Sequence, residues 1–283
     1  MNEIVWRGMT RPELDAAYNN AAAVKNSAEK TAEYAERSAR MRAQRNELLD
    51  LRYGPKPRNL IDIYRSGAAN APFFVFIHGG YWLRNSKETF ACTAEGLLPH
   101  GIDVAMIGYT LAPDAKLSEI VQEVRAALRF LRKEGPKHGV GQNGIILSGW
   151  SAGGHLTAMT VSEADAGFPI SGLYDVEPCR LNYVNDTLHM TADEAHAMSP
   201  ILHLAMQNKP MIIPYGLLER PEFQRQSQDY HAARKKAGMQ SELLPLEGHD
   251  HFSILEELAN PGGKLTRAVT RLADLVKQKA ATG

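Results

Sequence analysis

Seven short apolar runs, each bounded by turn-forming residues, are spread through this chain and alternate with stretches of helical periodicity such as residues 117–132 and 227–237. This alternation predicts an α/β fold, a mostly parallel, doubly wound sheet with helices on both faces. In such a sheet, ligands bind outside the carboxyl ends of the strands. The expected strands are residues 60–64, 72–77, 104–109, 144–147, 168–171, 211–215 and 243–246.

Two segments stand outside this alternation. Residues 11–50 are rich in alanine and charge and have helical character, whereas residues 176–207 lie between two expected strands and contain a capping-box pattern from Thr191 to Glu194. We therefore expect an N-terminal helical arm over residues 1–50 and a main domain over residues 51–283 with an insertion at about 176–208. Both extra segments are candidates to form small helical caps over a ligand site.

The expected strand at 144–147 leads into Gly149-Trp150-Ser151-Ala152-Gly153, which has the form G-x-S-x-G. In this motif a strand turns sharply into a helix and holds the serine hydroxyl at the tip, a strained turn that only small flanking residues allow. The same five-residue pattern also occurs in ordinary turns, so the interpretation of Ser151 depends on the other motifs in the chain. We predict that Ser151 is a nucleophile.

A second motif, His78-Gly79-Gly80-Tyr81-Trp82, directly follows the expected strand at 72–77. A glycine pair after a strand can expose consecutive backbone N–H groups, which acyl transfer needs around the oxygen that becomes negative. The N–H groups of Gly80, Tyr81 and Ala152 are therefore the predicted oxyanion hole.

A general base is expected on the loop after the last strand, where the sequence reads Gly248-His249-Asp250-His251-Phe252. His251 is favoured because it stands where the loop ends and Phe252 can anchor it. His249, next to a glycine, is the competing histidine.

The acid of a catalytic triad should lie between serine and histidine in sequence, after the preceding strand. Glu219 is the first carboxylate on the loop that follows residues 211–215, and there it could fix the tautomer of His251 and stabilise the imidazolium. The alternatives are Glu222, which also suits the first turn of the next helix, and Asp175, which follows the strand before.

With these motifs in place, the chain resembles the kynurenine formamidase (arylformamidase) branch of the α/β-hydrolase superfamily, near the hormone-sensitive-lipase-like esterases. The resemblance runs from about Arg52 to the end, implies an α/β-hydrolase fold and places the base on His251 rather than on His249. Similar members often have aspartate where this chain has Glu219, which can do the same work with a longer reach. The matching stretches are HGGYW from His78, GWSAGGH from Gly149, SGLYD from Ser171, PEFQRQS from Pro221 and DHF from Asp250.

Composition excludes several other classes of protein. Lys and Arg total 32 and Asp and Glu total 32, so no net charge points to a nucleic acid or an anionic membrane. Neither an apolar leader nor a membrane-spanning run is visible, so we expect a cytoplasmic protein. Cys92 and Cys179 suit reduced buried thiols, and no Cys/His spacing suggests zinc. No metal or organic cofactor is expected, and a homodimer is compatible with all of these features.

The expected reaction is two-step acyl transfer through a Ser-Glu-His triad. The resemblance favours a small acyl group on an aryl amide or ester, such as N-formylkynurenine. The alternatives are a general short-chain carboxylesterase and, from a different class, a catalytically silent hydrolase fold that binds a small molecule. Flat aromatic substrates would suit a pocket lined by Tyr81, Trp82, Trp150 and Tyr18.

Overall fold

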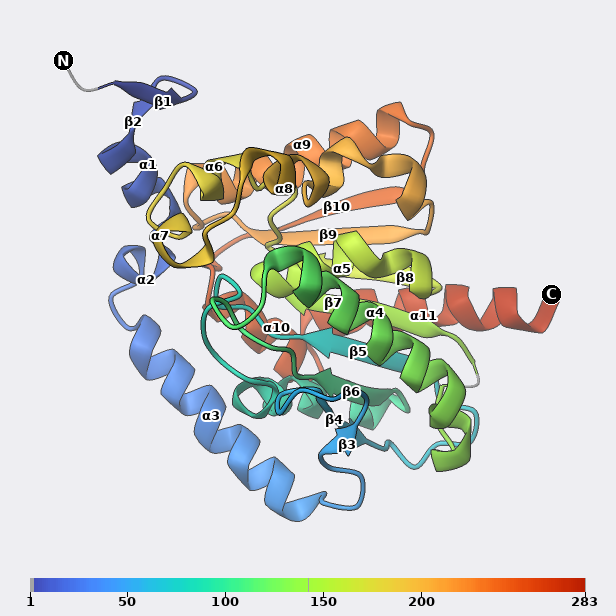
Figure 1. Ribbon diagram of the computed structural model, residues 1–283. Helices are drawn as coiled ribbons and strands as arrows, with labels where there is room; N and C mark the ends of the chain where they lie inside the picture. The colour runs from blue at the N-terminus through green and yellow to red at the C-terminus, as the bar shows by residue number, and fades with distance from the viewer. Residues whose placement is uncertain (1–2, 142, 283) are drawn as a thin grey trace.

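The computed structural model describes residues 3–141 and 143–282 and is built around an eight-stranded sheet (Figure 1). The strand order is β10-β9-β8-β7-β5-β6-β4-β3; the pairs from β10 to β6 are parallel, and β4 and β3 are antiparallel at one edge. The predicted fold class is thus confirmed. The strands of this sheet are β3 (Leu51–Arg52), β4 (Leu60–Tyr64), β5 (Phe73–Ile77), β6 (Asp103–Ile107), β7 (Ile145–Trp150), β8 (Ala166–Ile170), β9 (Met211–Gly216) and β10 (Ser241–Leu246).

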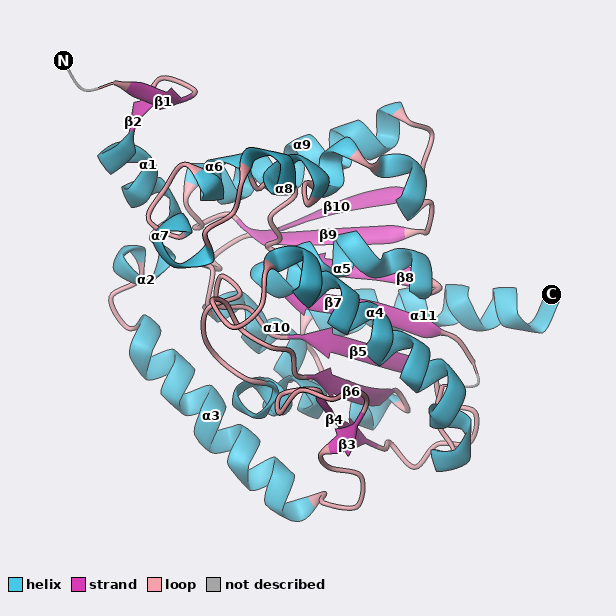
Figure 2. Ribbon diagram, viewed as in Figure 1, coloured by secondary structure: helices cyan, strands magenta, loops and turns pink. Residues whose placement is uncertain are grey.

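Helices cover both faces of the sheet (Figure 2). Strand β5 explains why, since its five residues are all buried and alternate between two cores. Phe73, Val75 and Ile77 pack in the core that includes α4 (Leu117–Glu134) and α5 (Ala152–Thr160), and Phe74 and Phe76 pack in the core that includes α11 (Lys264–Thr282). The remaining α-helices are α1 (Arg11–Tyr18), α2 (Asn20–Ala23), α3 (Ser27–Gln44), α6 (Glu177–Arg180), α7 (Asn185–Leu188), α8 (Ala192–Ala197), α9 (Pro221–Lys236) and α10 (Glu256–Ala259).

Helix α4 illustrates how the sequence sets this packing. Its buried residues recur every three or four positions, so a continuous apolar stripe faces the sheet while charged residues face solvent. These buried residues are Leu117, Ile120, Val121, Val124, Ala127, Leu128 and Leu131. Short 3₁₀ helices at Lys87–Gly96, Leu98–His100, Gly135–His138, Val161–Glu163, Pro200–Leu202, Leu204–Gln207 and Ser253–Leu255 complete the connections, and β1 (Ile4–Trp6) pairs with β2 (Met9–Thr10) near the N-terminus.

The N-terminal helices α1, α2 and α3 run past the carboxyl ends of the parallel strands, on the left of Figure 1. Helix α3 is fixed to the body of the protein by Tyr34, whose hydroxyl donates to the carbonyl of Phe252 at 2.9 Å, and by Ser38, whose hydroxyl donates to Thr89 at 3.0 Å. Arg37 adds ion pairs to Glu95 and Glu256. The arm is therefore joined to the loop that carries His251.

Strand β7 is longer than the sequence predicted. The apolar run ends at Leu147, but the strand continues to Trp150 because Ser148, Gly149 and Trp150 pair with residues of β8. β7 therefore delivers the chain directly to Ser151.

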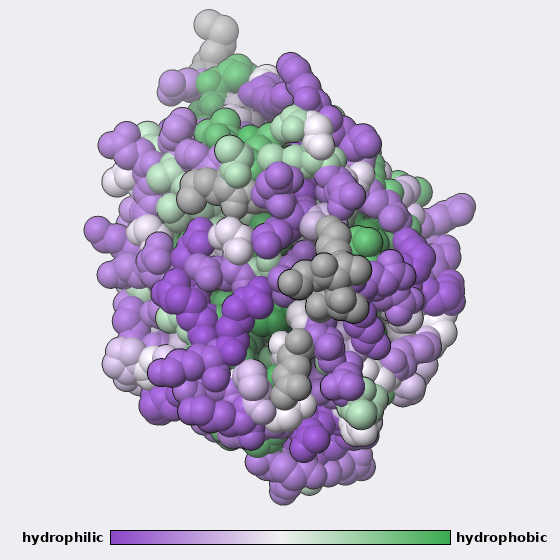
Figure 3. All heavy atoms as spheres, turned by 90° about the vertical axis from the view of Figure 1, so that its right-hand side faces the viewer, coloured by the Kyte–Doolittle hydropathy of each residue, from purple (hydrophilic) through white to green (hydrophobic). Residues whose placement is uncertain are grey.

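The right-hand side of the molecule in Figure 1 lies away from the carboxyl ends of the parallel strands. Figure 3 shows it covered mainly by hydrophilic side chains, with apolar ones in small separate patches. No helix among the described residues is both long enough and apolar enough to cross a membrane.

Candidate active site

Ser151 occupies the tight turn between β7 and α5. Its backbone has φ 59° and ψ −116°, a conformation that costs a residue with a side chain on the order of 1 kcal/mol or more. The turn depends on its glycines, because a Cβ on Gly149 would overlap the carbonyl of Gly153, and a Cβ on Gly153 would overlap the carbonyl of Ile77. The backbone N–H of Ser151 donates to Ile170 at 2.9 Å, which ties the turn to β8.

His251 lies on the loop after β10 and is only 3% exposed. Asp250 holds this loop by accepting the backbone N–H groups of Phe252 and Ser253 at 2.8 and 2.7 Å. The imidazole packs against Trp150 and Phe223, with ring centroids 5.0 and 4.7 Å away. The histidine ring is therefore held between the serine turn and helix α9.

Glu219 is the carboxylate that the structure brings to His251, with 3.6 Å between Glu219 Oε2 and His251 Nδ1. Its other oxygen, Oε1, accepts the backbone N–H of Gly216 at 2.9 Å and the hydroxyl of Ser171. Because two donors hold one oxygen, the other is left to face the histidine. Ser171, which the sequence reasoning did not single out by itself, stands just after β8 with φ 49°.

The alternative triad residues lie elsewhere. His249 Nε2 is 3.1 Å from Glu257 Oε1, and Asp175 Oδ1 accepts the N–H of Glu177 at 3.1 Å. Glu222 accepts two hydrogen bonds from Arg225, at 2.9 and 2.8 Å, and one from the hydroxyl of Tyr18 at 3.2 Å.

The loop after β5 has an unusual backbone, since Gly80, Tyr81 and Trp82 all have positive φ values of 116°, 53° and 61°. The Asn85 side chain donates to the carbonyl of Gly79 at 3.1 Å and braces this loop. The N–H groups of Gly80, Tyr81 and Ala152 make no hydrogen bond to any described residue. All three are thus free to bind a ligand oxygen.

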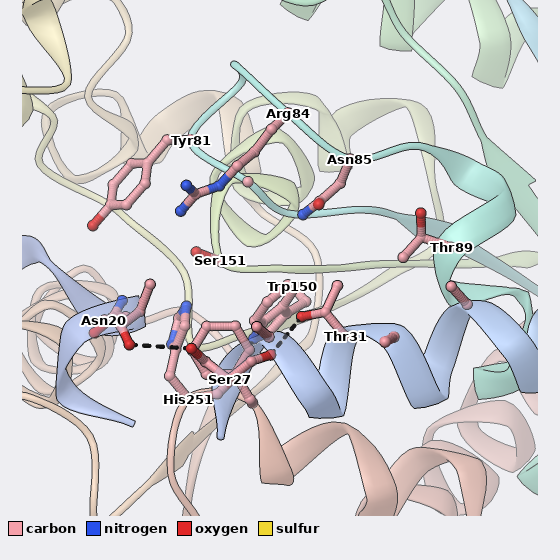
Figure 4. Close-up of a pocket in the computed structure, with 16 residues that line it drawn as sticks. Asn20, Ser27, Thr31, Tyr81, Arg84, Asn85, Thr89, Trp150, Ser151 and His251 are labelled. Carbon is pink, nitrogen blue, oxygen red and sulfur yellow. Dashed lines mark hydrogen bonds between the residues drawn. The ribbon is translucent and has the colours of Figure 1, made fainter. Parts of the chain in front are cut away.

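Ser151 and His251 line one cavity of about 540 Å³ (Figure 4). Gly80, Tyr81 and Trp150 line it as expected, together with Arg84, Asn85, Thr89 and Phe252. Helices α2 and α3 form the remaining wall, through Asn20, Ala21, Ser27, Ala28, Thr31, Ala32 and Ala35.

Two residues that were predicted to line the substrate pocket, Trp82 and Tyr18, do not line this cavity. Trp82 is fully buried, with its ring 5.0 Å from that of His155, and Tyr18 is fully buried, with its hydroxyl accepting from Gln226 at 3.1 Å. Tyr18 supports the wall indirectly, since its carbonyl accepts the hydroxyl of Tyr81 at 2.5 Å. The insertion at 176–207 likewise supplies none of the described lining residues; its Tyr183 ring packs 6.3 Å from Tyr81.

Two buried histidines stand behind the site and are held neutral. Burial lowers the pKa of His78 and of His155 to about 4, because an apolar environment disfavours the charged ring. His78 stacks on Tyr109 with ring centroids 4.3 Å apart, and His155 Nε2 lies 2.7 Å from the carbonyl of Met198.

One group of carboxylates, Asp50, Asp62 and Glu88, is close enough together to suggest a cation site. Lys87 already fills that role, since its ammonium lies 2.6 to 2.7 Å from an oxygen of each. The four charges form an ion-pair network that joins β4, the residue before β3 and the 3₁₀ helix Lys87–Gly96.

A serine on a strained strand-to-helix turn, a histidine after the last strand and a carboxylate beside it, all on one parallel sheet, define a serine hydrolase of the α/β-hydrolase fold. Comparison with known proteins agrees. The BD-FAE family model matches residues 61–169. A kynurenine formamidase from Salmo salar is 30% identical over 84% of this chain and 85% of its own length, and one from Danio rerio is 28% identical over 94% and 98%.

Among solved structures, a protein from Silicibacter sp. TM1040 proposed to be a thioesterase superimposes with a TM-score of 0.82 and 30% identity, over 91% of this chain and 99% of its own. The chain belongs to the kynurenine formamidase family of α/β-hydrolases.

Proposed function

We propose that this protein removes a formyl or other short acyl group from an aryl amide or ester, with N-formylkynurenine or a related aryl formamide as the substrate. The observation that carries the proposal is the cavity that Ser151 and His251 share. The aromatic residues Tyr81 and Trp150 form part of its wall. Aromatic walls suit a flat leaving group. The similarity to kynurenine formamidases supports the same substrate class.

In the proposed mechanism, His251 takes the proton of Ser151 as its hydroxyl oxygen attacks the substrate carbonyl. Glu219 orients the imidazole and stabilises its charged form. The N–H groups of Gly80, Tyr81 and Ala152 bind the oxyanion. None of the three donates a hydrogen bond to a described residue, which supports this role. His251 then protonates the leaving amine or alcohol, and a water molecule activated by the same histidine releases the acyl group.

Residues 1–50 take part in this proposal as a cap. Seven residues of α2 and α3 line the cavity, so the arm limits the space for the acyl group and the leaving group. We place the enzyme in the cytoplasm and assign it no metal or organic cofactor.

The proposal is tested with the purified full-length protein, assayed on N-formylkynurenine and on p-nitrophenyl esters of increasing acyl length. We expect turnover of N-formylkynurenine, and ester rates that fall steeply beyond roughly butyrate because α2 and α3 wall one side of the cavity. Ser151→Ala should lower kcat by several powers of ten and abolish labelling by a fluorophosphonate probe. If long-chain esters are the best substrates, the enzyme is instead a lipase-type esterase.

A further inference from the structure

Arg84 is the one arginine or lysine among the described residues that line the catalytic cavity. It stands three positions after Tyr81, on the loop that carries the proposed oxyanion donors. In Figure 4 its side chain extends from that loop toward Tyr81, on the side of the cavity where Ser151 lies. Burial raises the pKa of Tyr81 and of Tyr183, and the positive charge of Arg84 opposes this rise at both phenols.

No described residue forms an ion pair with the positively charged Arg84. Its guanidinium likewise forms no hydrogen bond with the described residues. The described lining of the cavity contains no Asp or Glu at all. By contrast, the nearby Arg58 donates to the carbonyls of Tyr109 and Asn85 at 2.8 and 2.6 Å. A cavity with one free guanidinium and no carboxylate attracts anions.

A second polar group in the wall also lacks a partner. Asn20, at the start of α2, is only 5% exposed and lines the same cavity, yet its side-chain Nδ2 donates no hydrogen bond to any described residue. A buried amide donor without an acceptor is costly, so a donor left in this state at a cavity wall is typical of a ligand contact. The cavity therefore presents two unsatisfied donors to an occupant that carries oxygen acceptors.

We propose that Arg84 binds a carboxylate on the leaving group of the substrate, and that Asn20 donates to a further oxygen of the same leaving group. The placement on the leaving group rests on the proposed function, because a formyl or acetyl group carries no carboxylate. The substrate class is thus narrowed to aryl amides and esters whose leaving group carries a carboxylate. Since a guanidinium can hold both oxygens of a carboxylate, Arg84 sets specificity as well as affinity.

The test uses two substrate pairs that differ only in charge. One pair is N-formylkynurenine and its carboxamide; the other is para-acetoxyphenylpropionate and its carboxamide. The wild-type enzyme should prefer the carboxylate of each pair in kcat/KM by about tenfold. In Arg84→Gln this preference should disappear through a higher KM for the carboxylates with kcat little changed, and Arg84→Lys should restore part of it.

Matched variants make the result specific. Arg40→Gln, an exposed arginine of α3 outside the cavity lining, should keep the wild-type preference. Asn20→Asp should disfavour both carboxylates more than their carboxamides, because it replaces a donor by a negative charge. The proposal is overturned if the wild-type enzyme does not distinguish the members of the pairs, or if Arg84→Gln slows all four substrates equally.

The ester pair separates this inference from the proposed function. A carboxylate preference on the ester pair that depends on Arg84, without turnover of either formamide, supports the role of Arg84 and contradicts the formamidase activity. Turnover of both formamides without any preference for the carboxylate supports the formamidase activity and contradicts the role of Arg84.

Discussion

The indole Nε1 of Trp150 donates a hydrogen bond to the carbonyl oxygen of His251 at 2.7 Å. Trp150 directly precedes the proposed nucleophile, so this contact joins the serine turn to the histidine loop. The two residues lie 101 positions apart in the chain, and their rings are also in contact. The relative position of Ser151 and His251 thus depends on the hydrogen bond from Trp150 to His251 as well as on the sheet.

Trp150→Phe removes this hydrogen bond but keeps an aromatic ring against His251. We expect the free energy of unfolding to fall by about 1 to 3 kcal/mol, because a buried carbonyl loses its donor. We also expect kcat to fall by about tenfold with little change in KM, since the histidine loop is less well positioned. Urea unfolding and steady-state kinetics measure the two effects. An unchanged kcat would mean that the sheet alone positions the histidine.

Replacing the two histidines of the last loop should have unequal effects. His251→Ala should lower kcat by about the same several powers of ten as Ser151→Ala, because either change removes a member of a cooperating group. His249→Ala loses only its contact with Glu257 and should change kcat by no more than a few fold. Kinetics on p-nitrophenyl acetate compares the variants, and equally damaging substitutions would leave the base unassigned.

Glu219→Gln should lower kcat by a factor of about 100 to 10,000, since a neutral amide cannot stabilise the imidazolium of His251. Ser171→Ala should cause a smaller loss, because it removes one of the two donors that hold Glu219 Oε1.

Asp175→Asn and Glu222→Gln serve as controls for this assignment and should retain kcat within a few fold, since both carboxylates bind other partners. A severe loss in Asp175→Asn would move the acid one strand earlier.

The buried histidines His78 and His155 make folding sensitive to acid. Their pKa is about 4 in the folded protein and about 6.5 when unfolded, so below pH 6.5 the unfolded chain binds more protons. Their stabilising effect is complete above pH 6.5 and is lost as the pH falls toward 4. For each of the two histidines, lowering the pH from 7 to 5 should decrease the free energy of unfolding by about 2 kcal/mol.

Urea unfolding of the wild-type protein and of His155→Gln at these two pH values tests the effect. The difference between pH 7 and pH 5 should be smaller in His155→Gln by about 2 kcal/mol, whatever its stability at pH 7. An identical difference in both proteins would contradict a neutral buried His155.

Much of the fold was predictable from the sequence because its signals are local. Each of the seven expected strands is present, with its ends exact or shifted by at most three residues, since a short apolar run between turn residues is enough to specify a buried strand. β7 was predicted too short because Ser148 and Gly149 carry no apolar signal, and only their pairing with β8 makes them part of the strand. The histidine and carboxylate that meet beside β9 and β10 could be named because each follows an expected strand.

Side-chain direction in the cavity could not be predicted in this way. Tyr81 and Trp82 are adjacent and both aromatic, yet the first lines the cavity and the second packs against His155 in the core. Their left-handed backbone conformation breaks the alternation that a strand would impose, so neighbouring letters carry no information about which way each ring points.

The sequence by itself determined the parallel sheet and the order of serine, carboxylate and histidine, because periodicity and turn chemistry are properties of neighbouring residues. Only the tertiary structure decided that α2 and α3, rather than the insertion at 176–207, line the cavity and that Tyr18 lies behind it. It also decided that the guanidinium of Arg84 and Nδ2 of Asn20 have no hydrogen-bond partner among the described residues. Those facts depend on how a helical arm packs against loops as many as 218 residues away in the chain. Packing over that distance depends on the shapes of both surfaces, and no local pattern in either one records it.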